Sequence, residues 1–179
     1  MRARLSRLSA RHWSLAGLAF CALMMAVALG LEHIAGLDPC PLCIFQRVAV
    51  LAAAAVLAVA AIHNPAGRVG GGLYGVLGLA AVAGGIGVAW RHLWLQSLPP
   101  EAVPACGPGL DYMMELLPWR DVLAMVLSGS GECAEIDLLF LGISLPGWTL
   151  IGFVVLALAP LGILLTALRG ARKEPGRRD

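Results

Sequence analysis

The sequence predicts an all-α membrane protein in which four transmembrane helices form a bundle. Of its 179 residues, 59% are hydrophobic and 13% are charged, whereas about a quarter of the residues in an ordinary soluble domain are charged. The mean hydropathy is +0.82. Four apolar segments approach the ~20 residues that a helix needs to cross the ~30 Å hydrocarbon core of a bilayer. They are residues 14–31, 44–62, 69–90 and 146–168.

These segments organise residues 1–179 as a single membrane domain with two loops on one side of the bilayer. The first loop covers residues 32–43 and the second covers residues 91–145. From residue 110 to 127 the second loop is apolar, but it contains charged residues and Pro118, so it does not resemble a membrane span. We expect short helices lying on the membrane surface in this part; a soluble packed loop is the alternative.

The basic residues predict the orientation, because cytoplasmic loops are enriched in lysine and arginine. Ten of the 13 lysines and arginines lie in the N-terminal arm, the link before residue 69 and the C-terminal tail. The second loop has only Arg91 and Arg120, beside seven acidic residues. We therefore expect both termini in the cytoplasm and both loops outside, in a compartment that permits disulfides.

The N-terminal segment has a second interpretation. Its arginines, its apolar run and the sequence Ala26-Val27-Ala28 also fit a signal peptide with a cleavage site. The apolar run is longer than the 7–15 residues of a usual signal core and continues to Leu31. We therefore expect this segment to be retained as the first transmembrane helix.

Small residues predict close packing between the helices. The third apolar segment contains Gly71 and Gly75, a pair spaced by four positions, and the second is rich in alanine. Such residues let helix backbones approach closely in lipid. A compact bundle is sufficient to explain them, and they indicate no function.

Cysteines supply the chemistry that this sequence offers. Cys21 lies in the middle of the first apolar segment, where a thiol usually serves as a small buried apolar residue. The other four form two pairs, Cys40 with Cys43 and Cys106 with Cys133, one pair in each outer loop. A zinc site is the rival interpretation, but Cys106 and Cys133 lack the short spacing of a zinc ribbon. We expect no metal.

The Cys40-Pro-Leu-Cys43 sequence lies just before the second apolar segment, which suggests electron exchange between thiols and a lipid-soluble molecule. Cys43 falls at the expected start of a helix, where unpaired N–H groups and the helix dipole stabilise a thiolate. Arg47 follows four residues later, on the same helix face. It would pair with this thiolate or with an oxygen of a bound acceptor; an arginine that merely reaches the membrane interface is the alternative.

The second pair lies in contrasting sequence. Cys106 is surrounded by prolines and glycines, which favour an extended, exposed segment able to form a mixed disulfide with a partner protein. Cys133 follows the sequence Ser128-Gly-Ser-Gly131, which we expect to be a flexible tether. A mobile Cys133 could reach either Cys106 or Cys40, so that electrons pass between the pairs by thiol–disulfide exchange.

Four motifs together resemble the DsbB family of inner-membrane disulfide oxidases, over residues 16–168. They are Cys40-Pro-Leu-Cys-Ile-Phe-Gln-Arg47, Arg91-His92-Leu-Trp-Leu-Gln96, Cys106-Gly-Pro-Gly-Leu-Asp-Tyr-Met113 and Gly129-Ser-Gly-Glu-Cys133.

This resemblance implies a role for each cysteine of the two pairs. A reduced thioredoxin-like partner, DsbA, would attack Cys106, and Cys133 would resolve that mixed disulfide and pair transiently with Cys40. Cys43 would meet ubiquinone or menaquinone as a thiolate. The resemblance further implies a periplasmic DsbA-like partner and the membrane quinone pool as the two reactants, in the bacterial inner membrane.

The resemblance also implies two residues that bind the quinone. Arg47 would lie close to the quinone ring, and His92, expected just past the third helix, would help to hold it; a histidine that simply lies at the interface is the alternative for His92. Many relatives have an acid where this chain has Gln46, and we expect that difference to leave Arg47 less neutralised.

The sequence therefore favours a thiol:quinone oxidoreductase that reoxidises a DsbA-like dithiol protein. Two other classes stay open at this point. One is a membrane carrier that moves reducing electrons outward, which would need cysteines on the cytoplasmic side or in mid-membrane, where only Cys21 lies. The other is a scaffold whose cysteines are structural. Nothing in the sequence suggests nucleic-acid binding.

Overall fold

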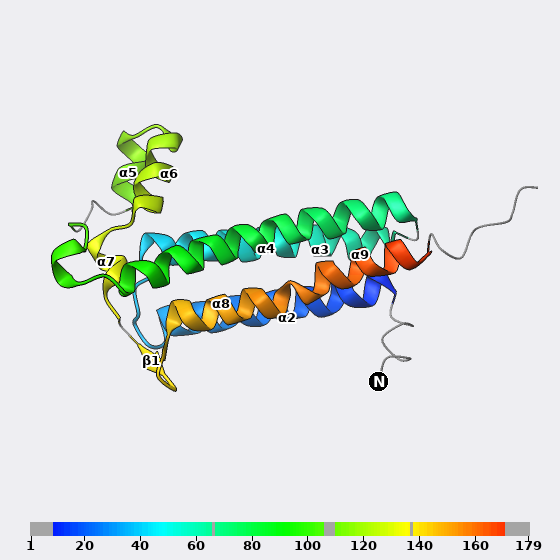
Figure 1. The fold of residues 1–179 in the computed structure, drawn as a ribbon, viewed down its shortest axis with the longest axis horizontal. Coiled ribbons are helices and arrows are strands. Elements are labelled where there is room, and N and C mark those ends of the chain that lie inside the picture. The colour runs from blue at the N-terminus through cyan, green and yellow to red at the C-terminus, as the bar shows by residue number, and fades with distance from the viewer. Residues whose placement is uncertain (1–8, 66, 106–109, 137, 171–179) are drawn as a thin grey trace, which may run out of the picture.

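A computed structural model describes residues 9–65, 67–105, 110–136 and 138–170 of the chain. Within these ranges, four helical spans are long and apolar enough to cross a membrane, which confirms the predicted fold class. They form an elongated bundle, with the start of the first span and the end of the last at one end (Figure 1). The cysteine-bearing loops lie at the other end, which we call the cysteine end.

The spans extend beyond the apolar segments that predicted them. The first is α2 (Ala10–His33), the second α3 (Pro41–His63) and the third α4 (Arg68–Gln96). The fourth consists of α8 (Leu145–Leu156) and α9 (Leu158–Gly170). The interruption at Ala157 has a local cause, because Pro160 has no N–H to donate to the Leu156 carbonyl.

The glycines of α4 form the surface on which α9 packs. A Cβ atom on Gly71 would lie 2.8 Å from the Cβ of Ala167, and one on Gly75 would lie 2.8 Å from the Cβ of Leu164. The two helices could therefore not approach so closely with larger residues at these positions. The predicted small-residue packing is thus present.

Shorter elements form the cysteine end. In chain order they are η1 (Pro100–Ala102), α5 (Leu110–Leu116), α6 (Trp119–Ser128), α7 (Gly131–Ala134), and a two-stranded antiparallel hairpin of β1 (Leu139–Phe140) and β2 (Ile143–Ser144). The predicted short helices of the second loop are α5 and α6, which end and begin around Pro118. They project from the side of the bundle (Figure 1).

This end has a hydrophobic core of its own, which we call the outer core. Its buried members come from five helices: α3, α4, α5, α6 and α7. They are Leu42, Leu95, Met113, Val122, Val126 and Cys133. The second loop is therefore packed onto the start of α3 and the end of α4.

One expected boundary was wrong. Residues 91–96 were assigned to the second loop, with His92 just past the third helix, but α4 continues through them to Gln96. The apolar run stops at Arg91. The helix continues beyond it because His92 and Leu95 are buried in contacts at the cysteine end. Packing against the outer core, rather than lipid, stabilises these last turns.

Candidate functional site

The first cysteine pair lies on the first turn of α3. Cys40 is the N-cap residue with an extended backbone, and Pro41 occupies a position at which its missing N–H costs no hydrogen bond. This start places both cysteine side chains on one turn. The Cys40 thiol donates a hydrogen bond to Cys43 Sγ over 3.3 Å.

His92 of α4 lies against both cysteines. Its Nε2 is 3.8 Å from Cys40 Sγ, and its Nδ1 is 4.0 Å from Cys43 Sγ. Gln46 Nε2 is 3.2 Å from the same Nδ1, and both of these side chains are buried. Because an amide NH₂ can only donate, Nδ1 accepts this bond and the ring proton belongs on Nε2, facing Cys40. Gln46 thus sets the tautomer of His92.

Cys133 approaches the pair from the outer loop. It is 1% exposed, on the short helix α7, and it belongs to the outer core on which Cys40 packs. The neighbouring Cys40 side chain, followed by burial, raises the pKa of Cys133 well above its usual range. Cys40 therefore contacts Cys43 in its own turn and packs against the core that contains Cys133.

The environment of Cys133 differs from the expected flexible tether. Gly129 and Ser130 are partly buried, and the Ser130 hydroxyl is 3.7 Å from Cys133 Sγ. The Gly131 N–H donates to the Ala105 carbonyl over 3.4 Å. The glycine–serine composition suggested mobility, but these contacts hold the segment against other residues of the same loop. Cys106 itself lies outside the described residues.

Arg47 has a partner that the sequence did not reveal. Its guanidinium forms an ion pair with Glu32 and donates a second hydrogen bond to the Ala28 carbonyl over 3.3 Å. Both acceptors lie in the last two turns of α2. Arg47 thereby links α2 to α3. The expectation that Gln46 leaves Arg47 less neutralised was wrong, because Glu32 supplies the acid from another helix.

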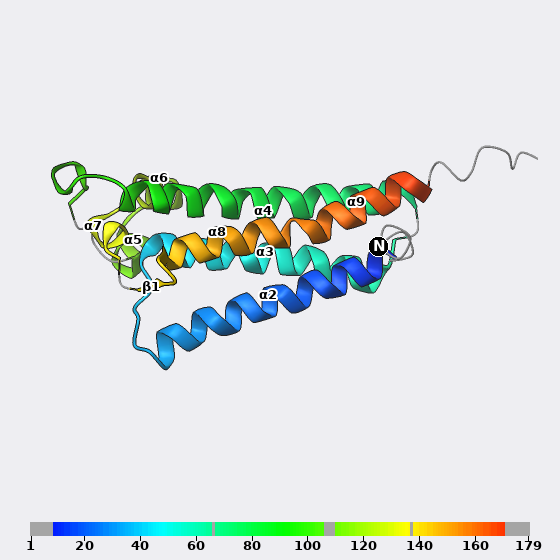
Figure 2. The same cartoon turned by 60° about the horizontal axis from the view of Figure 1, so that its bottom comes forward.

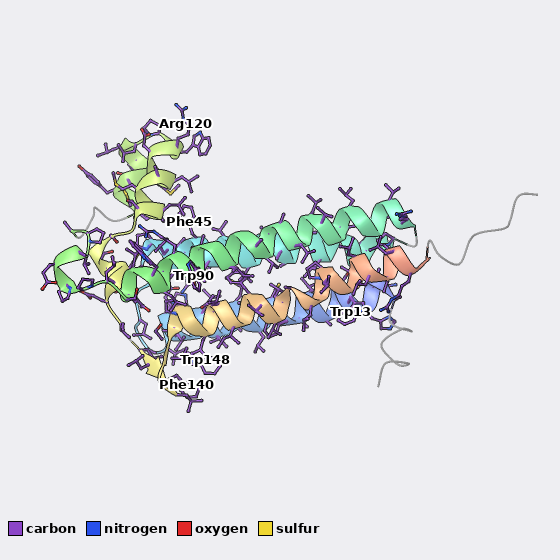
Figure 3. All side chains as sticks on the ribbon, viewed as in Figure 1. Trp13, Phe45, Trp90, Arg120, Phe140 and Trp148 are labelled. Atoms are coloured by element: carbon purple, nitrogen blue, oxygen red, sulfur yellow. The ribbon has the colours of Figure 1, made fainter. Side chains whose placement is uncertain are left out.

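A cavity of about 410 Å³ lies beside the pair. Its apolar walls come mainly from α2 and α8, for example Leu23, Val27, Ile151 and Val155. Cys40, Cys43, Gln46, Arg47 and His92 line its polar part. Figure 2 shows α2 diverging from the other long helices toward the cysteine end, where this cavity lies. Trp148 lines the cavity, and Figure 3 shows it at the start of α8 beside Phe140.

The cavity has the size and the lining of a ligand site. Ligand sites typically have volumes of about 300–1,000 Å³, apolar walls and a few polar groups that orient the ligand. Arg47 supplies N–H groups that can orient a polar ligand atom, and the walls supply apolar surface.

The thiols of Cys40 and Cys43 and the ring of His92 could also bind a metal ion, because their ligand atoms lie within 4.8 Å of one another. That site would use the same two sulfurs that a Cys40–Cys43 disulfide would need.

Of the six residues predicted for the site, the structure brings five together. These are Cys40, Cys43, Cys133, Arg47 and His92. Sequence reasoning missed Glu32 and the contact between Gln46 and His92. The only sequence signal for Glu32 was a carboxylate at the end of an apolar segment, and nothing in its position pointed to Arg47.

Comparisons with known proteins identify the family of this chain. The family model described as "Disulfide bond formation protein DsbB" matches residues 10–163. A protein named disulfide bond formation protein B from Chromohalobacter salexigens is 64% identical, over 90% of this chain and 94% of its own length. Relatives of the same name from Methylococcus capsulatus and Nitrosococcus oceani are 51% and 49% identical, over 82% and 87% of this chain and 88% and 91% of their own lengths. The chain is therefore a multi-pass membrane protein that belongs to the DsbB family of disulfide bond formation proteins.

Proposed function

We propose that this protein transfers electrons from a dithiol protein, through its two cysteine pairs, to a membrane quinone. One observation carries the proposal: Cys40 contacts Cys43 at the wall of the apolar cavity and Cys133 in the outer loop. A chain of sulfurs thus runs from the loop to the cavity. A structural disulfide would need no such third sulfur.

The exchange between the pairs conserves electrons and protons. A reduced partner attacks Cys106 in a Cys106–Cys133 disulfide and forms a mixed disulfide at Cys106. The partner's second thiol resolves this bond and leaves Cys106 and Cys133 as thiols. Attack by Cys133, the resolving role that the resemblance implied, would only return the partner in its reduced form. The Cys133 thiolate then attacks Cys40 in a Cys40–Cys43 disulfide. The Cys40–Cys133 bond forms, and Cys43 leaves as a thiolate. Cys106 next attacks Cys133 and releases Cys40, so that two electrons have moved to the inner pair.

The cavity supports a quinone, ubiquinone or menaquinone, as the electron acceptor. A bound quinone accepts two electrons and two protons and becomes a quinol. Cys43 and Cys40 line the cavity, and Arg47 and His92 line it beside them. Arg47 would stabilise negative charge on the Cys43 thiolate and hydrogen-bond to a ring oxygen. His92 would orient the ring and hold its Nε2 proton toward Cys40.

The charge distribution supports a bacterial inner-membrane location with both termini in the cytoplasm. Ten of the 13 lysines and arginines belong to the N-terminal arm, the link before residue 69 and the C-terminal tail, whereas the two cysteine-bearing loops are acidic. The cysteine pairs would then face the periplasm, where a DsbA-like thiol oxidase is the partner that delivers electrons. The disulfide chemistry of both pairs fits that oxidising compartment.

Quinone reduction by the purified protein tests the proposal. The detergent-solubilised protein, a reduced thioredoxin-like dithiol protein and a short-chain ubiquinone or menaquinone are mixed without oxygen. Quinol should form together with one disulfide per quinol, and the Cys43→Ser variant should form neither. A structural scaffold would leave the quinone unchanged in both proteins. A reductive carrier would instead use quinol to reduce a disulfide in the partner.

A further inference from the structure

The end of α4 binds the backbone on the N-terminal side of Cys133. Arg91 Nε donates to the Leu127 carbonyl over 3.0 Å, and its NH2 donates to the Ser128 carbonyl over 2.8 Å. The Arg91 guanidinium also lies 4.0 Å from the ring centre of Trp94, one turn further along α4. Arginine is suited to this role, since its planar fork donates in two directions while one face stacks on a ring.

These bonds also complete the end of α6. The last carbonyls of a helix have no partner within it, and a cation near them is favourable for the helix dipole. Arg91 satisfies two such carbonyls at once. It therefore joins the end of α6 to α4, five residues before Cys133.

The same part of α4 binds the backbone on the C-terminal side of Cys133. Gln96 Nε2 donates to the Glu135 carbonyl over 3.2 Å. The Ser144 hydroxyl donates to Gln96 Oε1 over 2.8 Å, so this glutamine is held from the start of α8. The segment with Cys133 is consequently attached to α4 on both sides.

Between these two attachments, the chain passes directly over Leu95. Gly129 has φ +86°, and a Cβ atom there would collide with the Leu95 side chain. Leu95 is fully buried and belongs to the same core as Cys133. The chain therefore reaches Cys133 through a close contact with α4 that a glycine permits.

We propose that Arg91 is a positioning residue: together with Gln96 it clamps the Cys133 segment onto α4 and so holds Cys133 beside Cys40. The same helix carries His92, which contacts Cys40, so one rigid element places both sulfurs. This inference rests on the proposed exchange between the pairs. In this proposal α4 positions the sulfurs for the step in which the Cys133–Cys40 bond forms and the Cys40–Cys43 bond breaks.

Cross-linking measures how readily Cys133 reaches Cys40, without any turnover of quinone. In a Cys43→Ala/Cys106→Ala background, diamide oxidises Cys40 and Cys133 to one disulfide and takes up their two electrons and two protons. The linked peptides are quantified by mass spectrometry, which also excludes Cys21. Because two charge-assisted hydrogen bonds are lost, Arg91→Met should slow the cross-link about tenfold or more. Arg91→Lys, which keeps the positive charge but loses the planar fork, should restore part of the rate.

Arg120→Met is the matched control, because it removes the same side chain from an exposed position. Figure 3 shows Arg120 at the outer tip of the α5–α6 region, away from the bundle. Its cross-linking rate should equal that of the parent. Equal rates in Arg91→Met and Arg120→Met would overturn the clamp. A parent that forms no Cys40–Cys133 cross-link would instead contradict the exchange on which the proposed function depends.

Steady-state kinetics separates positioning from a loss of folding. With all cysteines present, Arg91→Met should lower kcat with the dithiol protein and leave the KM for quinone unchanged. A melting temperature equal to that of the parent in detergent shows that the bundle is intact. If Arg91→Met does not fold, Arg91→Lys carries the test: an unchanged cross-linking rate and kcat in that variant would overturn the clamp.

Discussion

Replacement of Arg47 tests whether this residue acts in the quinone site or only anchors α3 at the interface. Arg47 lines the cavity while it holds Glu32 and the Ala28 carbonyl on α2, and its side chain is 20% exposed. A hydrogen bond to a charged group contributes about 1.5–3 kcal/mol. Since about 1.4 kcal/mol is a factor of ten, Arg47→Ala should lower kcat/KM for quinone reduction roughly ten- to a hundredfold.

Two further variants separate charge from geometry. Arg47→Lys cannot bond to Glu32, Ala28 and a quinone oxygen with one planar group, so quinone reduction should be impaired. Because the lysine keeps the positive charge, the impairment should be smaller than in the alanine variant. Glu32→Gln leaves Arg47 in place without its ion-pair partner. We expect quinone use to fall by about fivefold or less, because partly exposed ion pairs are weak. In an Arg47→Ala background, Glu32→Gln should have no further effect.

The assay is steady-state quinone reduction at varied quinone concentration, with the dithiol protein saturating. Glu101→Gln serves as the control for the loss of one negative charge, since Glu101 is exposed in η1. If Arg47→Lys and Arg47→Ala both keep the parental quinone affinity and turnover, Arg47 is an interfacial anchor and the assignment is refuted. If Glu32→Gln and Arg47→Ala have independent, multiplicative effects, Glu32 does not act through Arg47.

Two predictions concern the loop cysteine and the packing of the bundle. The pKa of Cys133 is raised, so its thiolate forms only at higher pH, and alkylation of Cys133 should remain slow at about pH 9, where an ordinary thiol is largely ionised. Cys40→Ala removes the largest cause of this shift and should move the alkylation profile toward lower pH; an unmoved profile would contradict the contact between the two sulfurs. A Cβ atom at Gly85 would collide with a buried ring on α8, so Gly85→Ala should destabilise the bundle by about 1–3 kcal/mol. Gly84→Ala meets open space on the same helix and should leave the melting temperature in detergent nearly unchanged; equal melting temperatures would contradict the packing of α4 on α8.

The helices and the first cysteine pair were predictable because their signals are local. Lipid requires a continuous run of about 20 apolar residues, and such runs stand out in this sequence. The position of Cys43 at a helix start follows from Cys40-Pro-Leu-Cys43 alone, since proline favours the first turn. The structure has this helix start at Pro41.

The contacts between helices were not predictable in the same way. Glu32 and Arg47 are 15 residues apart on different helices, and their pairing depends on how α2 packs against α3. The last turns of α4 were missed for a related reason. Arg91 interrupts the hydropathy signal, while its actual environment is the backbone of a loop 36 residues away. Gly129 and Ser130 likewise looked like a linker, although tertiary contacts hold them.

Photolabelling with an azidoquinone, followed by mapping of the labelled peptides, tests most directly whether the cavity beside Cys43 and Arg47 receives the quinone. The label should appear on the parts of α2 and α8 that line the cavity, such as Val27 and Ile151, and excess unlabelled quinone should suppress it. A label that excess quinone displaces from a different site, for example the smaller cavity beside Met113 and Val126, would contradict this placement of the electron acceptor.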